Sequence, residues 1–91
     1  MQPLHRSRPG EHFSEGSRLL WLALERLGHT QADAEAQLEC AAGAVNRLLY
    51  GDRKPGRALG DRIAERYGVQ VRAWDEEPKK RFVFPAARKT G

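Results

Sequence analysis

The stretch from Thr30 to Tyr50 constrains the fold of this chain more than any other part of its sequence. It holds two short segments with apolar residues at helical spacing, Gln31–Leu38 and about Ala42–Leu49, and mostly small residues join them at positions 39–43. Small side chains allow a tight turn, so the pattern predicts two short helices that meet at a steep angle. A plain helical hairpin has the same spacing, and the pattern alone does not distinguish it from a helix-turn-helix.

Helix signals also flank this stretch. Ser14 is a candidate N-cap for a helix over Glu15–Leu27, which Gly28 ends, and Thr30 with Asp33 matches the spacing of a capping box. A fourth helix and a short fifth helix or turn complete the expected core, at Arg57–Tyr67 and around Val69, Val71 and Trp74. We therefore expect an all-α fold, a compact bundle of four to five helices.

The two ends of the chain differ from its middle. Residues 1–13 contain prolines, a glycine and scattered charge without periodicity, which predicts a disordered basic leader before a domain over residues 14–77. Residues 78–91 carry five basic and no acidic side chains, which suits an arm that follows phosphates or a solubilising charge run. Within this tail, Arg81–Pro85 has strand-like composition. Its aromatic residues are expected to dock on their own domain, to pair with a second subunit or to remain exposed.

Composition argues against several classes of protein. No apolar run approaches the roughly 18 residues that cross a bilayer, and the first residues lack the apolar stretch of a signal peptide, so we expect a cytoplasmic protein without membrane contact. The single cysteine, Cys40, cannot form an internal disulfide and is expected in the core. The histidines, His5, His12 and His29, lack metal-ligand spacing with it, and no glycine-rich phosphate loop is present. We therefore expect no enzyme, no metal and no cofactor.

Three motifs, Gly28–Gln31, Gly43–Pro55 and Arg62–Val69, carry a resemblance to a known family. In the second motif, Asn-Arg-Leu-Leu is followed by a glycine, a basic pair and a proline. Over about two-thirds of its length, from Leu20 to Trp74, the chain resembles the lambda-repressor-like helix-turn-helix DNA-binding proteins (XRE-type, Cro-type). The resemblance implies a bundle whose third helix enters the major groove of double-stranded DNA. It also implies a homodimeric transcription regulator, a repressor or autoregulator, bound to an inverted repeat.

The resemblance further implies which residues touch DNA. Base contacts belong to the third helix and the turn before it, at Ala42, Gly43, Asn46 and Arg47. Backbone contacts belong to Gln31, Tyr50, Arg53 and Lys54. The Arg47 guanidinium suits bidentate pairing with guanine. Contact with a phosphate and a salt bridge at the protein surface are alternative roles of equal weight. An ordinary first-turn residue is the alternative for Gln31, and a solvated turn is the alternative for Arg53 and Lys54.

Two glutamates depart from the family pattern. Glu35 stands where the family favours alanine, and Glu39 stands where it favours a left-handed glycine, so keeping that conformation costs about 1 kcal/mol or more. Together with Asp33 they make the second helix acidic. A second hypothesis is therefore a helix-turn-helix that binds protein, as an adaptor, an antitoxin-like subunit or an antirepressor. Its partner would contact the second helix, Trp21 or Phe82–Phe84.

Overall fold

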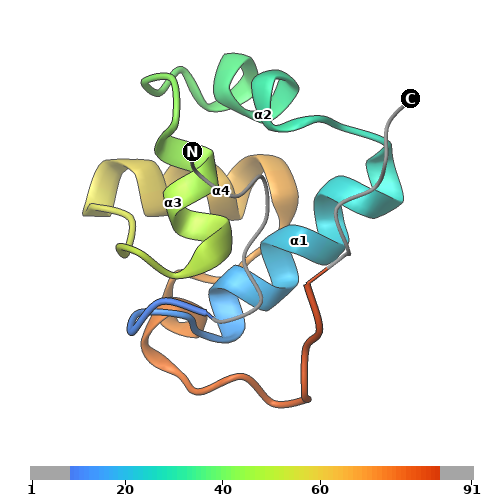
Figure 1. Ribbon diagram of the computed structural model, residues 1–91. Coiled ribbons are helices and arrows are strands. Elements are labelled where there is room, and N and C mark those ends of the chain that lie inside the picture. The colour runs from blue at the N-terminus through green and yellow to red at the C-terminus, as the bar shows by residue number, and fades with distance from the viewer. Residues whose placement is uncertain (1–8, 85–91) are drawn as a thin grey trace, which may run out of the picture.

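Four α-helices and one 3-10 helix make up the regular structure of residues 9–84, the part of the chain that the computed structural model describes (Figure 1). Their bounds are α1 Glu15–Leu27, α2 Gln31–Leu38, α3 Ala44–Tyr50, α4 Arg57–Tyr67 and η1 Val71–Asp75. This part of the chain contains no strand. The expected all-α globule is therefore confirmed, and residues 81–84, despite their strand-like composition, have no regular secondary structure.

Local signals in the sequence account for most helix ends. Ser14 caps α1 as expected, and its hydroxyl accepts a hydrogen bond from the backbone N–H of Ser17 at 3.3 Å. Thr30 and Asp33 form the expected reciprocal capping box at α2. The backbone nitrogen of Thr30 lies 2.9 Å from Oδ2 of Asp33, and the backbone nitrogen of Asp33 lies 3.0 Å from Oγ1 of Thr30. The backbone N–H of Thr30 also lowers the pKa of the Asp33 carboxyl below its ordinary value.

The start of α3 differs from the expectation. The helix begins at Ala44 and not near Ala42, because Gly43 adopts a left-handed conformation with φ of 87° and ends the turn. Glycine reaches this conformation at no steric cost. Ala42 therefore belongs to the turn and not to the helix.

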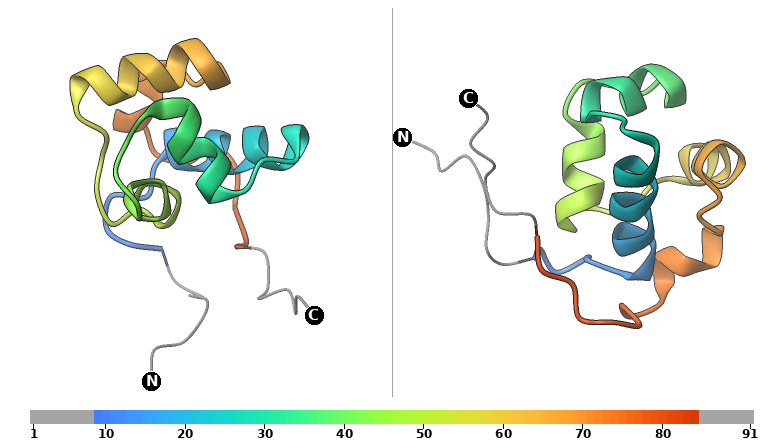
Figure 2. Two further views of the ribbon diagram at one scale, coloured as in Figure 1. Left: turned by 90° about the horizontal axis from the view of Figure 1, so that it is seen from above. Right: turned by 90° about the vertical axis from the view of Figure 1, so that its right-hand side faces the viewer.

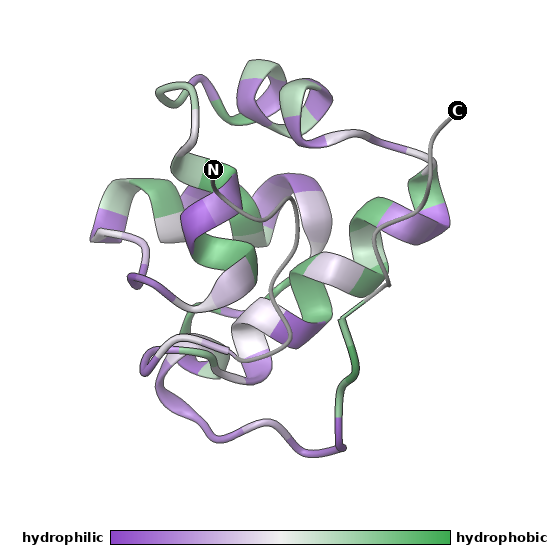
Figure 3. Cartoon of the chain, in the orientation of Figure 1, coloured by the Kyte–Doolittle hydropathy of each residue, from purple (hydrophilic) through white to green (hydrophobic). Residues whose placement is uncertain are grey.

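Helix α1 lies at the centre of the fold. It runs between α3 and α4 and also packs against η1, as the right-hand view of Figure 2 shows. Its buried side chains meet those of the other elements in one cluster that includes Leu20, Leu38, Leu48, Leu49 and Ile63. Polar and apolar residues alternate along the helices, as expected where only one side of each helix is buried (Figure 3). No helix within residues 9–84 is long and apolar enough to cross a membrane.

Five rings from distant parts of the chain form what we call the aromatic cluster: Phe13, Trp21, Tyr50, Phe82 and Phe84. The Phe84 ring contacts the other four, and the Trp21 indole N–H donates to the carbonyl of Leu49 at 2.6 Å. The tail thus docks on its own domain, which is one of the three alternatives that its composition left open. Between the two tail rings, Val83 is 75 % exposed.

The chain before α1 is also tied to the domain. The backbone N–H groups of Gly10 and His12 donate to the carbonyls of Tyr50 and Gly51 at 2.7 and 2.8 Å. The expectation of no structure in residues 1–13 was therefore wrong for residues 10–13, because these hydrogen bonds link segments far apart in sequence. Residues 1–8 lie outside the described part of the chain.

A buried carboxylate joins the tail to the first turn of α1. Glu15 is 3 % exposed, and its carboxylate accepts hydrogen bonds from the Arg18 guanidinium at 2.5 and 2.8 Å and from the backbone N–H of Lys79 at 2.7 Å. The guanidinium is the largest cause that lowers the pKa of Glu15, and burial opposes it. The hydrogen bond from Lys79 joins α1 to a segment 64 residues away, and the salt bridge with Arg18 holds the carboxylate within α1.

These contacts predict an acid dependence of stability. Because the folded pKa of Glu15 lies below its unfolded value, its contribution is present above the ordinary pKa of about 4.5 and is lost as the pH falls through the folded pKa. Urea unfolding of Glu15→Gln is expected to show lower stability at neutral pH and a weaker loss on acidification. The exposed Glu25→Gln on the same helix is the control, and equal acid sensitivity of Glu15→Gln and the parent protein would contradict the assignment.

A second prediction concerns the contact between α1 and η1. A Cβ atom at Gly16 would lie 2.4 Å from Cδ2 of Trp74, so Gly16→Ala is expected to lower the free energy of unfolding by about 1 to 3 kcal/mol. The matched control is Gly60→Ala in α4, where the new Cβ would meet only Cγ of Pro55 at 3.9 Å. The free energy of unfolding of this control is expected to rise by about 0.5 to 1 kcal/mol, measured by the same urea titration.

Candidate nucleic-acid interface

The candidate interface is built on α2, α3 and the turn between them. Figure 1 shows α2 lying across the N-terminal end of α3, and the two helices pack through buried apolar side chains. These are Ala34, Leu38, Val45 and Leu48, which the apolar periodicity identified. Packing on this side leaves the opposite side of α3 and the turn before it at the surface.

Two of the expected DNA-contacting residues touch each other. The Nδ2 of Asn46 donates to Oε1 of Gln31 at 3.3 Å, which joins the first turn of α2 to α3. Both side chains are half-buried. No sequence rule connects two amides 15 residues apart across a turn, so this contact is visible only in the folded chain.

The other expected base-contacting residues lie beside this pair at the surface. Ala42, Gly43 and Arg47 are exposed. Within residues 9–84 the Arg47 guanidinium forms no ion pair, which removes the surface salt bridge from its alternatives as far as the described chain goes. Ala42 and Gly43 offer no side-chain donor, so only Asn46 and Arg47 can form side-chain hydrogen bonds with a base edge.

The expected backbone contacts divide into two groups. Arg53 and Lys54 are exposed in the loop after α3, where Lys54 Nζ forms an ion pair with Asp75 Oδ1 at 2.9 Å. Tyr50 is different, because it is 9 % exposed and its ring packs against Trp21 and Phe84. The docked tail thus covers a side chain that the resemblance assigned to the DNA backbone. Tyr50 takes part in the aromatic cluster and is not brought together with the other candidates.

The carboxylate of Glu35, which departs from the family pattern, has a structural role. Glu35 Oε2 accepts a hydrogen bond from the backbone N–H of Gly43 at 2.7 Å and so holds the turn against α2. The negative charge also lies at the N-terminal end of α3, where the helix dipole favours it. A carboxylate placed here, together with the exposed Asp33 and Glu39, opposes the approach of phosphate to α2.

The remaining polar residues near α2 make contacts within the fold. Cys40 is half-buried against the core, and burial is the main cause that raises the pKa of its thiol and disfavours the nucleophilic thiolate. His29 Nδ1 forms a hydrogen bond with the Tyr67 hydroxyl at 2.9 Å, which joins the start of α2 to the end of α4. Among the described residues, no group of histidine, cysteine and carboxylate side chains is arranged to hold a metal ion.

Comparisons of the chain with protein-family models, with curated proteins and with solved structures found no match. The candidate interface therefore depends on its geometry and on the residues that form it.

The turn between α2 and α3 yields a third prediction. Glu39 has φ of 55° and ψ of 45°, the left-handed conformation that strains any side chain with a Cβ. Glu39→Gly is expected to raise the free energy of unfolding by about 1 kcal/mol, measured by urea titration. The same change at the exposed helical position Glu65 should lower it by about 1 kcal/mol. A similar loss at both positions would show that Glu39 is not left-handed in solution.

Proposed function

We propose that this protein is a sequence-specific DNA-binding transcription regulator of the lambda-repressor-like helix-turn-helix type, a repressor or autoregulator. In this proposal α3 enters the major groove, and the turn after it follows the sugar-phosphate backbone. The observation that carries the proposal is the hydrogen bond between Gln31 and Asn46. It unites a candidate backbone contact and a candidate base contact on one surface, beside the exposed Arg47.

The geometry of the two amides supports distinct roles. The contact with Gln31 restrains the Asn46 side chain, and Asn46 Nδ2 keeps a second hydrogen while Oδ1 keeps its lone pairs. These are the groups with which asparagine pairs to adenine N7 and N6. Arg47, one residue later, would pair with guanine O6 and N7. Gln31 lies in the first turn of α2, where N–H groups and the helix dipole favour a phosphate.

The loop after α3 supports a ranking of the phosphate contacts. Arg53 has no ion-pair partner among the described residues, whereas Lys54 is held by Asp75. Binding of Lys54 to phosphate therefore competes with an existing ion pair. We propose Arg53 as the stronger backbone contact, and a homodimer whose two α3 helices bind half-sites about one turn apart.

The acidic side of α2 favours a second candidate function, a protein-binding helix-turn-helix. Asp33, Glu35 and Glu39 would repel phosphates and attract a basic partner. The alternative docking surface at Trp21 and Phe82–Phe84 is less favoured, because these rings pack on each other within the chain. The two candidates differ in salt dependence, since phosphate contacts release counterions and a duplex must bind less tightly as salt rises.

The decisive experiment is selection of bound duplexes from random DNA, followed by fluorescence polarisation at about 50 and 200 mM salt. Arg47→Ala is expected to lose about 1 to 3 kcal/mol of binding free energy and to relax the preference at one base pair. Arg53→Ala should weaken binding to all sequences alike and reduce the slope of log affinity against log salt concentration by about one unit. Lys54→Ala should have the same effects to a smaller extent.

Arg72→Ala is the matched control for charge, because this exposed arginine lies on η1, which packs against α1 and α4. Its affinity for the selected duplex is expected to stay close to that of the parent protein. Failure to enrich any sequence, or affinity that does not change with salt, would overturn the proposal and favour the protein-binding candidate. A single chain on each selected site would overturn the dimer alone.

A further inference from the structure

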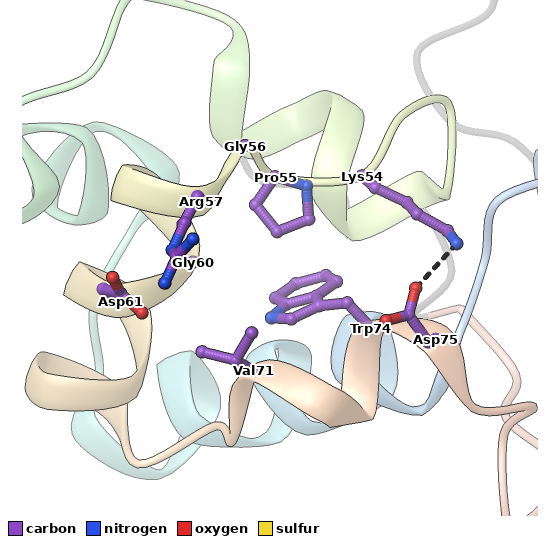
Figure 4. Close-up of a pocket in the computed structure, with 9 residues that line it drawn as sticks. All are labelled: Lys54, Pro55, Gly56, Arg57, Gly60, Asp61, Val71, Trp74 and Asp75. Carbon is purple, nitrogen blue, oxygen red and sulfur yellow. Dashed lines mark hydrogen bonds and ion pairs between the residues drawn. The ribbon is translucent and has the colours of Figure 1, made fainter.

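A pocket of about 390 Å³ lies between the first turns of α4 and the 3-10 helix η1 (Figure 4). Its apolar walls are the ring of Pro55, the indole of Trp74, the side chain of Val71 and the backbone at Gly60. Volumes from about 300 to 1,000 Å³ are typical of sites for small molecules. None of the residues that carry the candidate interface on α2 and α3 lines it, and of the expected DNA-backbone contacts only Lys54 does.

A buried donor without a partner lies in the wall of this pocket. Trp74 is 3 % exposed, and its Nε1 has no hydrogen-bond partner among the described residues. In Figure 4 the nitrogen lies on the edge of the indole that is turned toward α4. Buried indole N–H groups usually find an acceptor. The other tryptophan of the chain, Trp21, donates to the Leu49 carbonyl. Trp74 Nε1 is therefore a buried donor for which residues 9–84 supply no acceptor.

The first turn of α4 adds further donors on the same side of the pocket. Its N-cap is Gly56, which has no side chain to accept from the N–H groups of the turn. The helix is 11 residues long, so its dipole adds partial positive charge at this end. Arg57 lines the pocket and carries a full positive charge. The donors and the cation all favour an anionic acceptor.

Two carboxylates line the pocket, and they limit where the anion can lie. Asp75 is neutralised by its ion pair with Lys54 at 2.9 Å. Asp61 is exposed and lies one turn along α4 from Arg57, in the helix and not at its N-terminal end. An anionic group is therefore favoured between the first turn of α4 and the Trp74 edge, and the apolar side chains of Pro55 and Val71 favour an apolar body beside it.

We propose that this pocket binds a small planar carboxylate, with its ring against the side chains of Pro55 and Val71 and its carboxylate accepting hydrogen bonds from Trp74 Nε1 and the first turn of α4. The site is separate from the exposed side of α3 and does not depend on DNA binding. In a DNA-binding regulator it would serve as an effector site. Its chemistry is the same if the chain binds protein instead.

The test is an NMR titration of the full chain with sodium benzoate, observed at the two tryptophan indole N–H resonances. Trp21→Phe identifies them, because only the Trp74 resonance remains in that variant. Benzoate is expected to produce a saturable shift of the Trp74 resonance and no shift of the Trp21 resonance. No Trp74 shift, or equal shifts at both tryptophans, would overturn the proposal.

Gly60→Leu is the variant that fills the pocket. A Cβ at this position meets only Pro55 Cγ at 3.9 Å, so the side chain extends into the pocket without a backbone clash. Ala58→Leu is the matched control, since Ala58 is exposed on the same helix and does not line the pocket. Gly60→Leu is expected to abolish the saturable shift, and Ala58→Leu to retain it. Retention of the shift in Gly60→Leu would overturn the assignment of the site.

Two further probes separate the parts of the ligand. Sodium sulfate supplies an anion without a ring, and benzamide supplies a ring and an acceptor without charge. Both are expected to shift the Trp74 resonance much less than benzoate at equal concentration. A sulfate shift equal to that of benzoate would show that the site recognises only an anion at the helix end and not the ring. An equal benzamide shift would show that charge is not recognised. Either result would overturn the proposed ligand class.

Discussion

The contact between the backbone of Gly16 and the indole of Trp74 is the constraint on which much of this structure depends. Any side chain at Gly16 would overlap the indole ring, so α1 and η1 can approach only because this position has no Cβ. The buried indole then closes the core and forms one wall of the pocket beside α4. Its neighbour Asp75 reaches Lys54, so the same contact positions the loop that follows α3.

Backbone hydrogen bonds from distant segments complete the domain around this core. The first turn of α1 receives the start of the tail through Glu15 and Lys79, while residues 10–13 pair with the end of α3. Both ends of the described chain therefore converge near the aromatic cluster. The cluster covers Tyr50 and leaves Arg47 exposed, and so it defines how much of α3 remains at the surface.

The turn between α2 and α3 shows how stabilising and strained features coexist at a candidate site. The carboxylate of Glu35 satisfies the backbone N–H of Gly43, whereas Glu39 adopts a left-handed conformation that glycine would adopt without strain. Both glutamates place negative charge near the surface proposed to approach phosphate. Binding of DNA here would therefore depend on Arg47, Arg53 and the ordered amide pair more than on overall charge complementarity.

The sequence by itself determined the local features of this protein. Apolar periodicity, caps and glycine stops depend on residues a few positions apart, and they predicted α1, α2 and α4 with the bounds that the structure has. The strain at Glu39 was expected from the resemblance to the helix-turn-helix family, whose pattern favours glycine there, and not from these local signals. The start of α3 was misjudged because alanine suits a helix or a turn, and the left-handed conformation of Gly43 decided between them.

Only the tertiary structure decided the contacts that join distant segments. The pairing of Gln31 with Asn46, the docking of Phe82 and Phe84, and the exclusion of Tyr50 from the surface arise from packing between elements. The pocket at Trp74 has the same origin. Periodicity shows which face of a helix is apolar, but it contains no information about which other element will cover that face. That choice depends on the shapes of all the surfaces that must pack together at once.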